Sequence, residues 1–352
     1  MSGTEAGKPA ADDCDLAALE RYLRERVDGF FGPIRAERCG GGRSNPTYLL
    51  RTPKKNYVMR TKPGPQAKLL PSAHAIEREF RVQSALAASA MPVAKMYCLC
   101  TDESVIGRAF YVMEHVEGRV LWDQSLPGMT QAERAAIYDE LNRVIAALHT
   151  VDYAALGLAD YGKSGNYFAR QVDRWIKQYR ASEMACIEEM EKLIAWLPQH
   201  IPADGGDWVA LVHGDYRLDN VIFHPTEPRI LAVIDWELST LGHPLADFSY
   251  HLMSWHMPQE SFRGLRGHDL AALGIPDEKT YRQMYQRRVN RPLGDNWNFY
   301  LAYNLFRVAA ILQGIAKRAH EGLSSHARDL DFGNNAPMLA KIGWQFAQQV
   351  GS

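Results

Sequence analysis

The chain has 352 residues, of which 46% are hydrophobic and 23% are charged, a balance that supports a sizeable globular core. The length favours about two domains. The 40 Lys and Arg residues nearly cancel the 41 Asp and Glu residues, and the net charge of −1 argues against a general nucleic-acid binder. Five cysteines without metal-ligand spacing, and an N-terminus without an apolar signal core, indicate reduced thiols in a cytoplasmic protein.

The first third of the chain predicts a small β-sheet with helices. Residues 1–14 are expected to be a disordered lead-in, and apolar residues then recur at helical spacing from Leu16 to Phe30. Short β-type runs separated by glycine-rich or polar turns follow between Ile34 and Lys62. One more helix and two more strands are expected at Ala73–Ala88, Met96–Cys100 and Ala109–Met113. The pattern predicts a five-stranded domain over residues 15–117.

From Gly118 onward the pattern is mainly helical, which predicts a second domain over residues 118–352. Thr130, with Glu133 three residues later, forms a capping box that opens a helix. The stretch Phe299–Ile315 is the most apolar of the chain, but polar residues interrupt it, so it predicts a buried helix rather than a membrane span. A short β island is expected at Trp208–Val212, Val221–Phe223 and Ile230–Ile234, a loop at Pro258–Pro276, and further helices at Asn166–Arg180, Ser182–Leu197, Asp277–Asn290, Trp297–His320 and Asn335–Val350. The fold class is therefore α+β.

Two motifs at the ends of a predicted hairpin carry the chemistry. The first is H-G-D-x₄-N at residues 213–220, and the second is I-D-W-E at residues 234–237. Phosphoryl transfer from Mg-ATP needs a carboxylate that accepts the proton of the attacking hydroxyl, and Asp215 fits that role. It also needs oxygen ligands for Mg²⁺, which the Asn220 amide and the Asp235 carboxylate supply. The alternative is that Asp215 and Asn220 are turn residues.

These motifs resemble those of the aminoglycoside phosphotransferase family, which is related to choline kinases and more distantly to protein kinases. The segments Gly41–Thr47, Leu69–Glu79 and Leu312–Gly314 are similar to a subgroup that includes the kinase-like domain fused to some acyl-CoA dehydrogenases. The resemblance implies a protein-kinase-like fold of two lobes. It also implies ATP and Mg²⁺ as cofactors.

The resemblance also assigns nucleotide-binding residues in the N-terminal lobe. The loop between the first two strands would cover the ATP phosphates, with Gly41 and Gly42 allowing close backbone approach and with Ser44 and Asn45 adding side-chain donors. An ordinary hairpin turn is the alternative.

Similar proteins place a phosphate-anchoring lysine on the third strand, where this chain has Arg60. Arginine keeps the charge and can bind phosphate with two hydrogen bonds. Lys62 lies on the same face of the strand, so the sequence leaves open which of the two contacts the phosphates. Glu79 is the carboxylate that the resemblance pairs with this cation, and a solvated helix face is the alternative for it and for Glu77.

The segment at residues 110–118 resembles the hinge of such kinases. The resemblance implies that the Glu114 carbonyl and the Val116 amide bind adenine and that Met113 lies at the back of the adenine pocket. It also implies that His213 packs beneath the catalytic loop. Asp247 would hold backbone N–H groups of that loop, with a helix N-terminal charge as the alternative.

The phosphoryl acceptor is expected to be a small molecule. No A-P-E anchor follows Asp235, which argues against a peptide substrate. Residues 257–328 hold eleven Lys and Arg against six Asp and Glu, a field that suits a neutral or anionic acceptor better than a polycationic aminoglycoside. Arg307, inside an apolar helix, is the expected acceptor contact, while a solvated charged face is the alternative.

The sequence thus predicts an ATP- and Mg²⁺-dependent kinase that acts on a hydroxyl of a small metabolite. The subgroup resemblance suggests a hydroxy acid or a hydroxyacyl-CoA as the acceptor, with no nucleic-acid or membrane partner. The alternatives are an antibiotic phosphotransferase and a catalytically silent nucleotide-binding module. Oligomeric state and the choice between ATP and GTP are not specified by the sequence.

Overall fold

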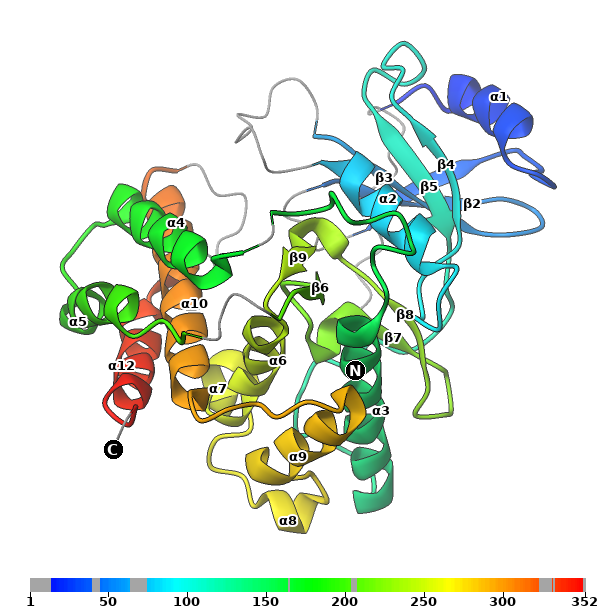
Figure 1. Ribbon diagram of the computed structural model, residues 1–352. Coiled ribbons are helices and arrows are strands. Elements are labelled where there is room, and N and C mark those ends of the chain that lie inside the picture. Colours follow the sequence, from blue (N-terminus) through cyan, green and yellow to red (C-terminus); the bar gives the residue numbers. More distant parts are fainter. Residues whose placement is uncertain are drawn as a thin grey trace. The chain divides into compact units, whose positions relative to one another are not determined.

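The computed structural model describes residues 14–39, 45–63, 75–163, 165–203, 208–322, 331 and 333–350 (Figure 1). The chain forms two compact units, residues 1–119 with 221–238 and residues 120–220 with 239–352. The predicted lead-in, apart from Cys14, lies outside the described residues.

The first unit is built on a five-stranded sheet in the order β1-β2-β3-β5-β4, in which every neighbouring pair is antiparallel. The predicted sheet is thereby confirmed. Its strands and the two helices of the unit are β1 Arg35–Arg38, β2 Thr47–Arg51, β3 Tyr57–Thr61, β4 Met96–Cys100, β5 Phe110–Glu114, α1 Leu16–Arg26 and α2 Ile76–Leu86.

The two faces of this sheet bury different helices because side chains alternate along each strand. Met59 and Val112 belong to the core that includes Leu19 and Leu23 of α1. The residues beside them, Tyr111 and Met113, pack instead against Ile76 and Phe80 of α2. Arg60 pairs in register with Tyr111, so it lies on the face that α2 covers.

A hairpin that the sequence placed in the second domain packs with the first unit. It consists of β7 Val221–Phe223 and β8 Ile230–Val233. The N–H groups of Arg119 and Phe223 each donate to the other's carbonyl at 2.8 Å, and the Val233 N–H donates to the Pro92 carbonyl at 2.8 Å. At Gly118 a Cβ atom would lie 2.3 Å from the Phe223 carbonyl oxygen, so the close approach requires glycine there.

The second unit is mainly helical. Its long helix α10 packs against α12, α4 and α6, while α3 packs against α9 (Figure 1). The capping box at Thr130 is confirmed. The elements are α3 Gln131–Thr150, α4 Tyr167–Ser182, α5 Glu188–Trp196, η1 Leu197–Gln199, β6 Ala210–Val212, η2 Leu218–Asn220, β9 Thr240–Gly242, α6 Pro244–Leu252, η4 Met253–Trp255, α7 Gln259–Phe262, α8 Leu270–Leu273, α9 Glu278–Val289, α10 Trp297–His320 and α12 Ala336–Ala347; η3 Trp236–Leu238 belongs to the first unit.

Two local predictions need correction. The β island is two separate ladders, because β6 pairs with the unpredicted strand β9 while β7 pairs with β8. The predicted loop at Pro258–Pro276 contains the short helices α7 and α8, each of four residues, for which helical periodicity gives no clear signal.

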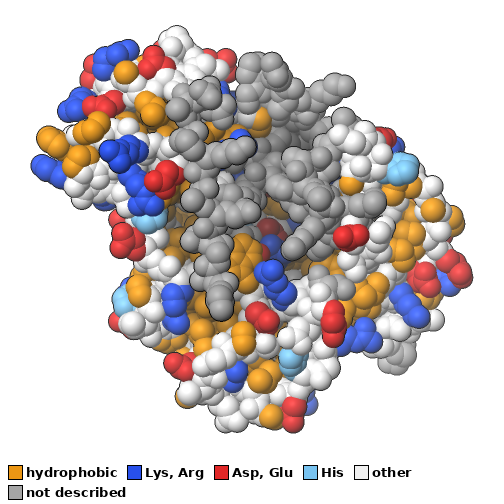
Figure 2. Space-filling model, turned by 180° about the vertical axis from the view of Figure 1, so that it is seen from behind, with side chains coloured by type: hydrophobic (Ala, Val, Ile, Leu, Met, Phe, Trp, Pro, Cys, Tyr) orange, Lys and Arg blue, Asp and Glu red, His pale blue; other side chains and the backbone are white. Residues whose placement is uncertain are grey.

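Helix α10 is a core element. It is the one helix among the described residues that is long and apolar enough to cross a membrane, yet 83% of its most apolar window is buried in the protein. The face shown in Figure 2 carries acidic and basic side chains interspersed, in keeping with the net charge of −1.

Candidate functional site

Arg60 in the first unit is surrounded by three carboxylates. Its Nη1 atom lies 3.3 Å from Glu79 Oε2, and its Nη2 atom lies 2.9 Å from Asp235 Oδ1 and 3.1 Å from Glu237 Oε2. The Arg60 side chain is only 12% exposed. Burial opposes its charge, but the three carboxylates outweigh this effect and raise the pKa of Arg60, which is therefore a fixed cation.

Asp235 occupies a strained position directly after the β7–β8 hairpin. Its φ of 65° lies in the left-handed region that non-glycine residues seldom adopt, and such strain is concentrated at functional sites. Asn220 is the residue before β7, and Val221 pairs with Val233, two residues before Asp235. Both expected Mg²⁺ ligands therefore flank one hairpin.

Glu79 is the buried partner of Arg60. Its Oε1 accepts from Asn45 Nδ2 at 2.8 Å, and its Oε2 accepts from Tyr111 Oη at 3.0 Å. Burial raises the pKa of Glu79 to about 7, against the opposing charge of Arg60. The expected phosphate donor Asn45 is completely buried, so its amide is directed into the protein at Glu79.

Lys62 has a different partner. Its ammonium group binds Glu77, and both side chains are about one-third exposed. Arg60 and Lys62 therefore have separate carboxylate partners although they share a strand face, and the guanidinium of Arg60 is the group that contacts Asp235.

The structure describes only some of the other residues that were predicted to bind the nucleotide. Gly41, Gly42 and Ser44 lie outside the described residues. Met113 packs on the sheet face that α2 covers. Glu114 is the last residue of β5, and its N–H donates to the Lys95 carbonyl at 2.8 Å. Val116 follows the strand and is partly buried.

Asp215 in the second unit is held by two side-chain hydrogen bonds and one ion pair. Tyr250 Oη donates to its Oδ1 at 2.5 Å, Asn220 Nδ2 donates to its Oδ2 at 2.9 Å, and Arg217 Nε lies 3.4 Å from Oδ1. The carboxylate keeps 22% exposure. Because the amide nitrogen of Asn220 is bound to Asp215, its amide oxygen is the atom suited to a cation.

Asp247 holds the backbone that presents Asp215. It accepts from the His213 N–H at 2.7 Å and from the Gly214 N–H at 2.9 Å, and His149 Nε2 lies 3.2 Å away. Burial opposes ionisation, yet the hydrogen bond and charge of His149, with help from His213, lower the pKa of Asp247. Gly214 has φ +84°, a conformation that favours glycine.

His213 is completely buried, and its Nδ1 accepts from the Asp215 N–H at 3.2 Å. It thus lies beneath the loop and contacts its backbone, where it has no exposure to a ligand.

Arg307 lies against the same loop. Its Nη2 donates to the Gly214 carbonyl at 2.7 Å, and its guanidinium carbon lies 5.0 Å from the ring centre of Tyr250. With only 7% exposure, Arg307 uses its charge on the loop backbone. Its expected contact with the acceptor stays a prediction.

Four of the other basic residues of the segment 257–328 contact different groups. Arg288 pairs with Asp139 at 2.7 Å, Arg282 and Arg291 lie over Trp297 and Trp208, and Lys317 donates to the Ala181 carbonyl. These contacts do not test the charge argument, and the preference for a neutral or anionic acceptor stays a prediction.

The sequence reasoning missed three side chains at these two clusters. Tyr250 lies three residues after Asp247 on α6, Glu237 is the last residue of the I-D-W-E motif, and Arg217 lies inside the H-G-D-x₄-N motif. Glu237 and Arg217 could have been predicted because they lie inside the two motifs. Tyr250 lies outside both motifs, and its contact with Asp215 is seen only in the folded structure.

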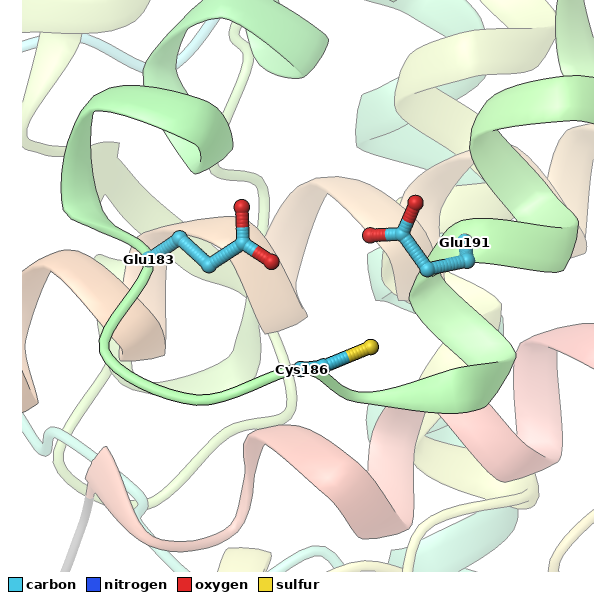
Figure 3. Close-up of side chains that lie close together, drawn as sticks. All are labelled: Glu183, Cys186 and Glu191. Atoms are coloured by element: carbon cyan, nitrogen blue, oxygen red, sulfur yellow. The ribbon is translucent and has the colours of Figure 1, made fainter.

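A further acidic cluster lies in the second unit, where α4 connects to α5. Glu183, Cys186 and Glu191 place potential ligand atoms within 4.8 Å of one another (Figure 3). Arg180 Nη1 already contacts Glu183 at 3.1 Å and Glu191 at 2.5 Å. Arg180 therefore offsets one of the two negative charges, and the cluster is an ion-pair network at the surface.

Comparison with known proteins agrees with this arrangement of motifs. The profile of the phosphotransferase enzyme family matches residues 35–285. Mouse acyl-CoA dehydrogenase family member 10 is 46% identical over 337 residues, which are 95% of this chain and 31% of that protein. The chain thus spans about a third of the length of this curated relative.

Solved structures show the same fold. A Ralstonia eutropha protein, provisionally assigned as an aminoglycoside phosphotransferase, is 60% identical with a TM-score of 0.89, and the match covers 96% of this chain and all of that one. A ternary complex of a thermostable mutant of aminoglycoside phosphotransferase APH(4)-Ia with AMP-PNP and hygromycin B is 15% identical with a TM-score of 0.61, covering 95% and 99% of the two chains.

The fold is that of a protein-kinase-like phosphotransferase, as the sequence predicted. The chain belongs to the phosphotransferase enzyme family, and its resemblance to the kinase-like domain of acyl-CoA dehydrogenase relatives is confirmed.

Proposed function

We propose that this protein is an ATP- and Mg²⁺-dependent small-molecule kinase that phosphorylates a hydroxyl group of a neutral or anionic metabolite. The observation that carries the proposal is the Asp215 carboxylate, which remains partly exposed although two hydrogen bonds and an ion pair fix its position. A turn residue with a purely structural role needs no such arrangement.

Asp215 is proposed as the general base. Its carboxylate accepts the proton of the acceptor hydroxyl as the hydroxyl oxygen forms a bond to the γ-phosphorus, while the bond to the bridging oxygen breaks and ADP leaves. Tyr250 and Asn220 orient the carboxylate by occupying one oxygen each. Each oxygen has a second lone pair, so a position for the incoming hydroxyl remains.

The donor residues fit a magnesium nucleotide. The Asn220 amide oxygen and the Asp235 carboxylate are the hard oxygen ligands that Mg²⁺ prefers. When bound, Mg²⁺ would offset the negative charge of the β- and γ-phosphates. Arg60, oriented by Glu79, supplies a permanent cation for the phosphates. AMP-PNP in the APH(4)-Ia complex supports ATP as the donor.

The acceptor is proposed to be a hydroxy acid or a hydroxyacyl-CoA. The mouse relative is an acyl-CoA dehydrogenase family member, which supports an acyl substrate for the region that matches this chain. Arg217 lies 3.4 Å from Asp215 Oδ1 and its side chain is 46% exposed, so its guanidinium can contact an anionic acceptor.

The test is ADP release from Mg-ATP with a panel of hydroxy acids, hydroxyacyl-CoA thioesters and aminoglycosides. Asp215→Asn should reduce turnover by about 10³-fold or more while Mg-ATP still raises the thermal midpoint. Asp173→Asn is the matched control, because its exposed carboxylate pairs with Lys177 on the same helix surface. Wild-type turnover in Asp215→Asn would contradict the mechanism, and no Mg-ATP binding by the wild type would contradict the function.

A further inference from the structure

A small pocket in the second unit lies between the end of η4 and the C-terminal helix α12. Its free volume is about 170 Å³, and Trp255, His256 and Arg266 line one part of it. Pockets that hold drug-sized ligands measure roughly 300–1,000 Å³, so this one suits a smaller molecule. Its lining shares no residue with the clusters around Arg60 and Asp215.

Helix α12 and the turn after it supply the other wall, which consists of Ile342, Gln345, Phe346 and Gln349. These residues recur at intervals of three, four and seven positions, which places them on one helix face. Ile342 is buried and Phe346 is partly buried, whereas the two glutamines are exposed. The wall therefore combines apolar surface with two side-chain amides.

Trp255 and His256 are held in place by other elements. Trp255 Nε1 donates to the Pro276 carbonyl at 2.9 Å. His256 Nε2 lies 2.7 Å from Glu278 Oε2, and the His256 ring meets the Phe346 ring edge to face with centroids 4.8 Å apart. Because these side chains are already ordered, a ligand does not bear the cost of fixing them.

Arg266 supplies the charge of the pocket. Its loop folds back on η4, because the Leu265 N–H donates to the Ser254 carbonyl at 2.7 Å. The Arg266 N–H donates to the Met257 carbonyl at 3.1 Å. A Cβ atom at Gly264 would lie 2.1 Å from the Met257 oxygen, so this return of the chain requires glycine.

The guanidinium of Arg266 has room for an anionic partner. Arg266 is exposed, and within the described ranges of the chain no carboxylate oxygen lies within 4 Å of its guanidinium nitrogens. The imidazole of His256, in contrast, is paired with Glu278. One arginine with a planar fork of donors matches the two oxygens of a carboxylate. A ligand with several phosphates would need further cations.

We propose that this pocket binds a small monocarboxylate with a flat apolar body, of the kind that an aromatic carboxylate has. The carboxylate binds Arg266, and the body lies against Trp255, Ile342 and Phe346. The site is separate from the proposed phosphoryl transfer, so the inference does not depend on the role of Asp215.

The experiment is a calorimetric titration of benzoate into the full chain. The wild type should bind benzoate with a Kd of about 1 mM or lower. Benzamide lacks the charge and acetate lacks the ring, so each should bind at least about tenfold more weakly than benzoate.

Two variants locate the binding. Arg266→Gln removes the charge, and Gln345→Trp fills the pocket from an exposed position of α12, so each should weaken benzoate binding by about tenfold or more. The matched controls are Arg291→Gln and Gln348→Trp. Arg291 is an exposed arginine that lies 4.8 Å from the ring centre of Trp208, and Gln348 is exposed but does not line the pocket. Both controls should stay within about twofold of the wild type.

Absence of benzoate binding by the wild type would overturn the inference. So would equal binding of benzamide or of acetate, or wild-type affinity in both Arg266→Gln and Gln345→Trp, with thermal unfolding showing that the two variants are folded. Benzoate binding without ADP release on any acceptor of the panel would refute the proposed function alone.

Discussion

Replacing Asp247 with asparagine changes the acceptor that holds the backbone of the Asp215 loop. The Asp247 Oδ2 atom accepts the His213 N–H at 2.7 Å and its Oδ1 accepts the Gly214 N–H at 2.9 Å. Asparagine has almost the same shape but only one carbonyl oxygen. Its amide nitrogen must therefore face one of the two backbone N–H groups, donor against donor.

The cost can be worked from these contacts. Asp247 is 2% exposed, so an N–H that loses this acceptor faces a buried side chain. An unsatisfied buried donor costs about 1–3 kcal/mol, and the remaining hydrogen bonds lose the extra strength that a charged acceptor gives, about 1 kcal/mol more. Asp247→Asn should therefore lower the free energy of unfolding by about 3 kcal/mol. Because Gly214 directly precedes Asp215, turnover should fall by about 100-fold as well.

Urea unfolding followed by circular dichroism measures the first effect, and ADP release measures the second. The matched control is Asp277→Asn. Asp277 caps α9 by accepting the Thr280 N–H at 2.7 Å, and asparagine is an equally good N-cap. The control should stay within about 0.5 kcal/mol of the wild type. If Asp247→Asn were as stable as this control, the claim that both carboxylate oxygens are needed to satisfy the His213 and Gly214 N–H groups would be wrong.

Three further predictions concern single side chains. Tyr250→Phe removes the 2.5 Å hydrogen bond to Asp215, so kcat should fall about tenfold while the KM for Mg-ATP is unchanged; equal changes in both would contradict a positioning role. Arg60→Lys keeps the charge, but a single ammonium group cannot contact Glu79, Asp235 and Glu237 together. The KM for Mg-ATP should therefore rise at least about fivefold. An unaltered KM would argue against phosphate binding by Arg60. Burial lowers the pKa of His251 to about 4 from 6.5, so the unfolded chain takes up the proton first as the pH falls. Stability should therefore decrease from pH 6.5 toward pH 4, and urea unfolding at pH 7.5 and pH 5 should show that His251→Gln loses about 2 kcal/mol less than the wild type; an equal loss in both would refute it.

Local sequence patterns determined much of the fold. Met96–Cys100 and Trp297–His320 have the bounds that periodicity predicted, because a strand repeat of two and a helix repeat of 3.6 are written in consecutive residues. The H-G-D-x₄-N and I-D-W-E motifs also identified the family before any coordinates, since both lie within short stretches around one hairpin. The assigned roles of Asp215, Asn220 and Asp235 remain predictions that the proposed experiments test.

The tertiary structure decided which side chains act together. Arg60 and Lys62 share a strand face, and Glu77 and Glu79 share a helix turn, so the sequence could not assign the two pairs; packing brings Arg60 to Glu79 and leaves Lys62 with Glu77. Tyr250 reaches Asp215 only because α6 packs under the loop. The contacts of Arg282, Arg288 and Arg291 likewise could not be read from the summed charge of residues 257–328. Periodicity records which face a residue occupies, whereas its partner from a distant segment depends on how the elements pack.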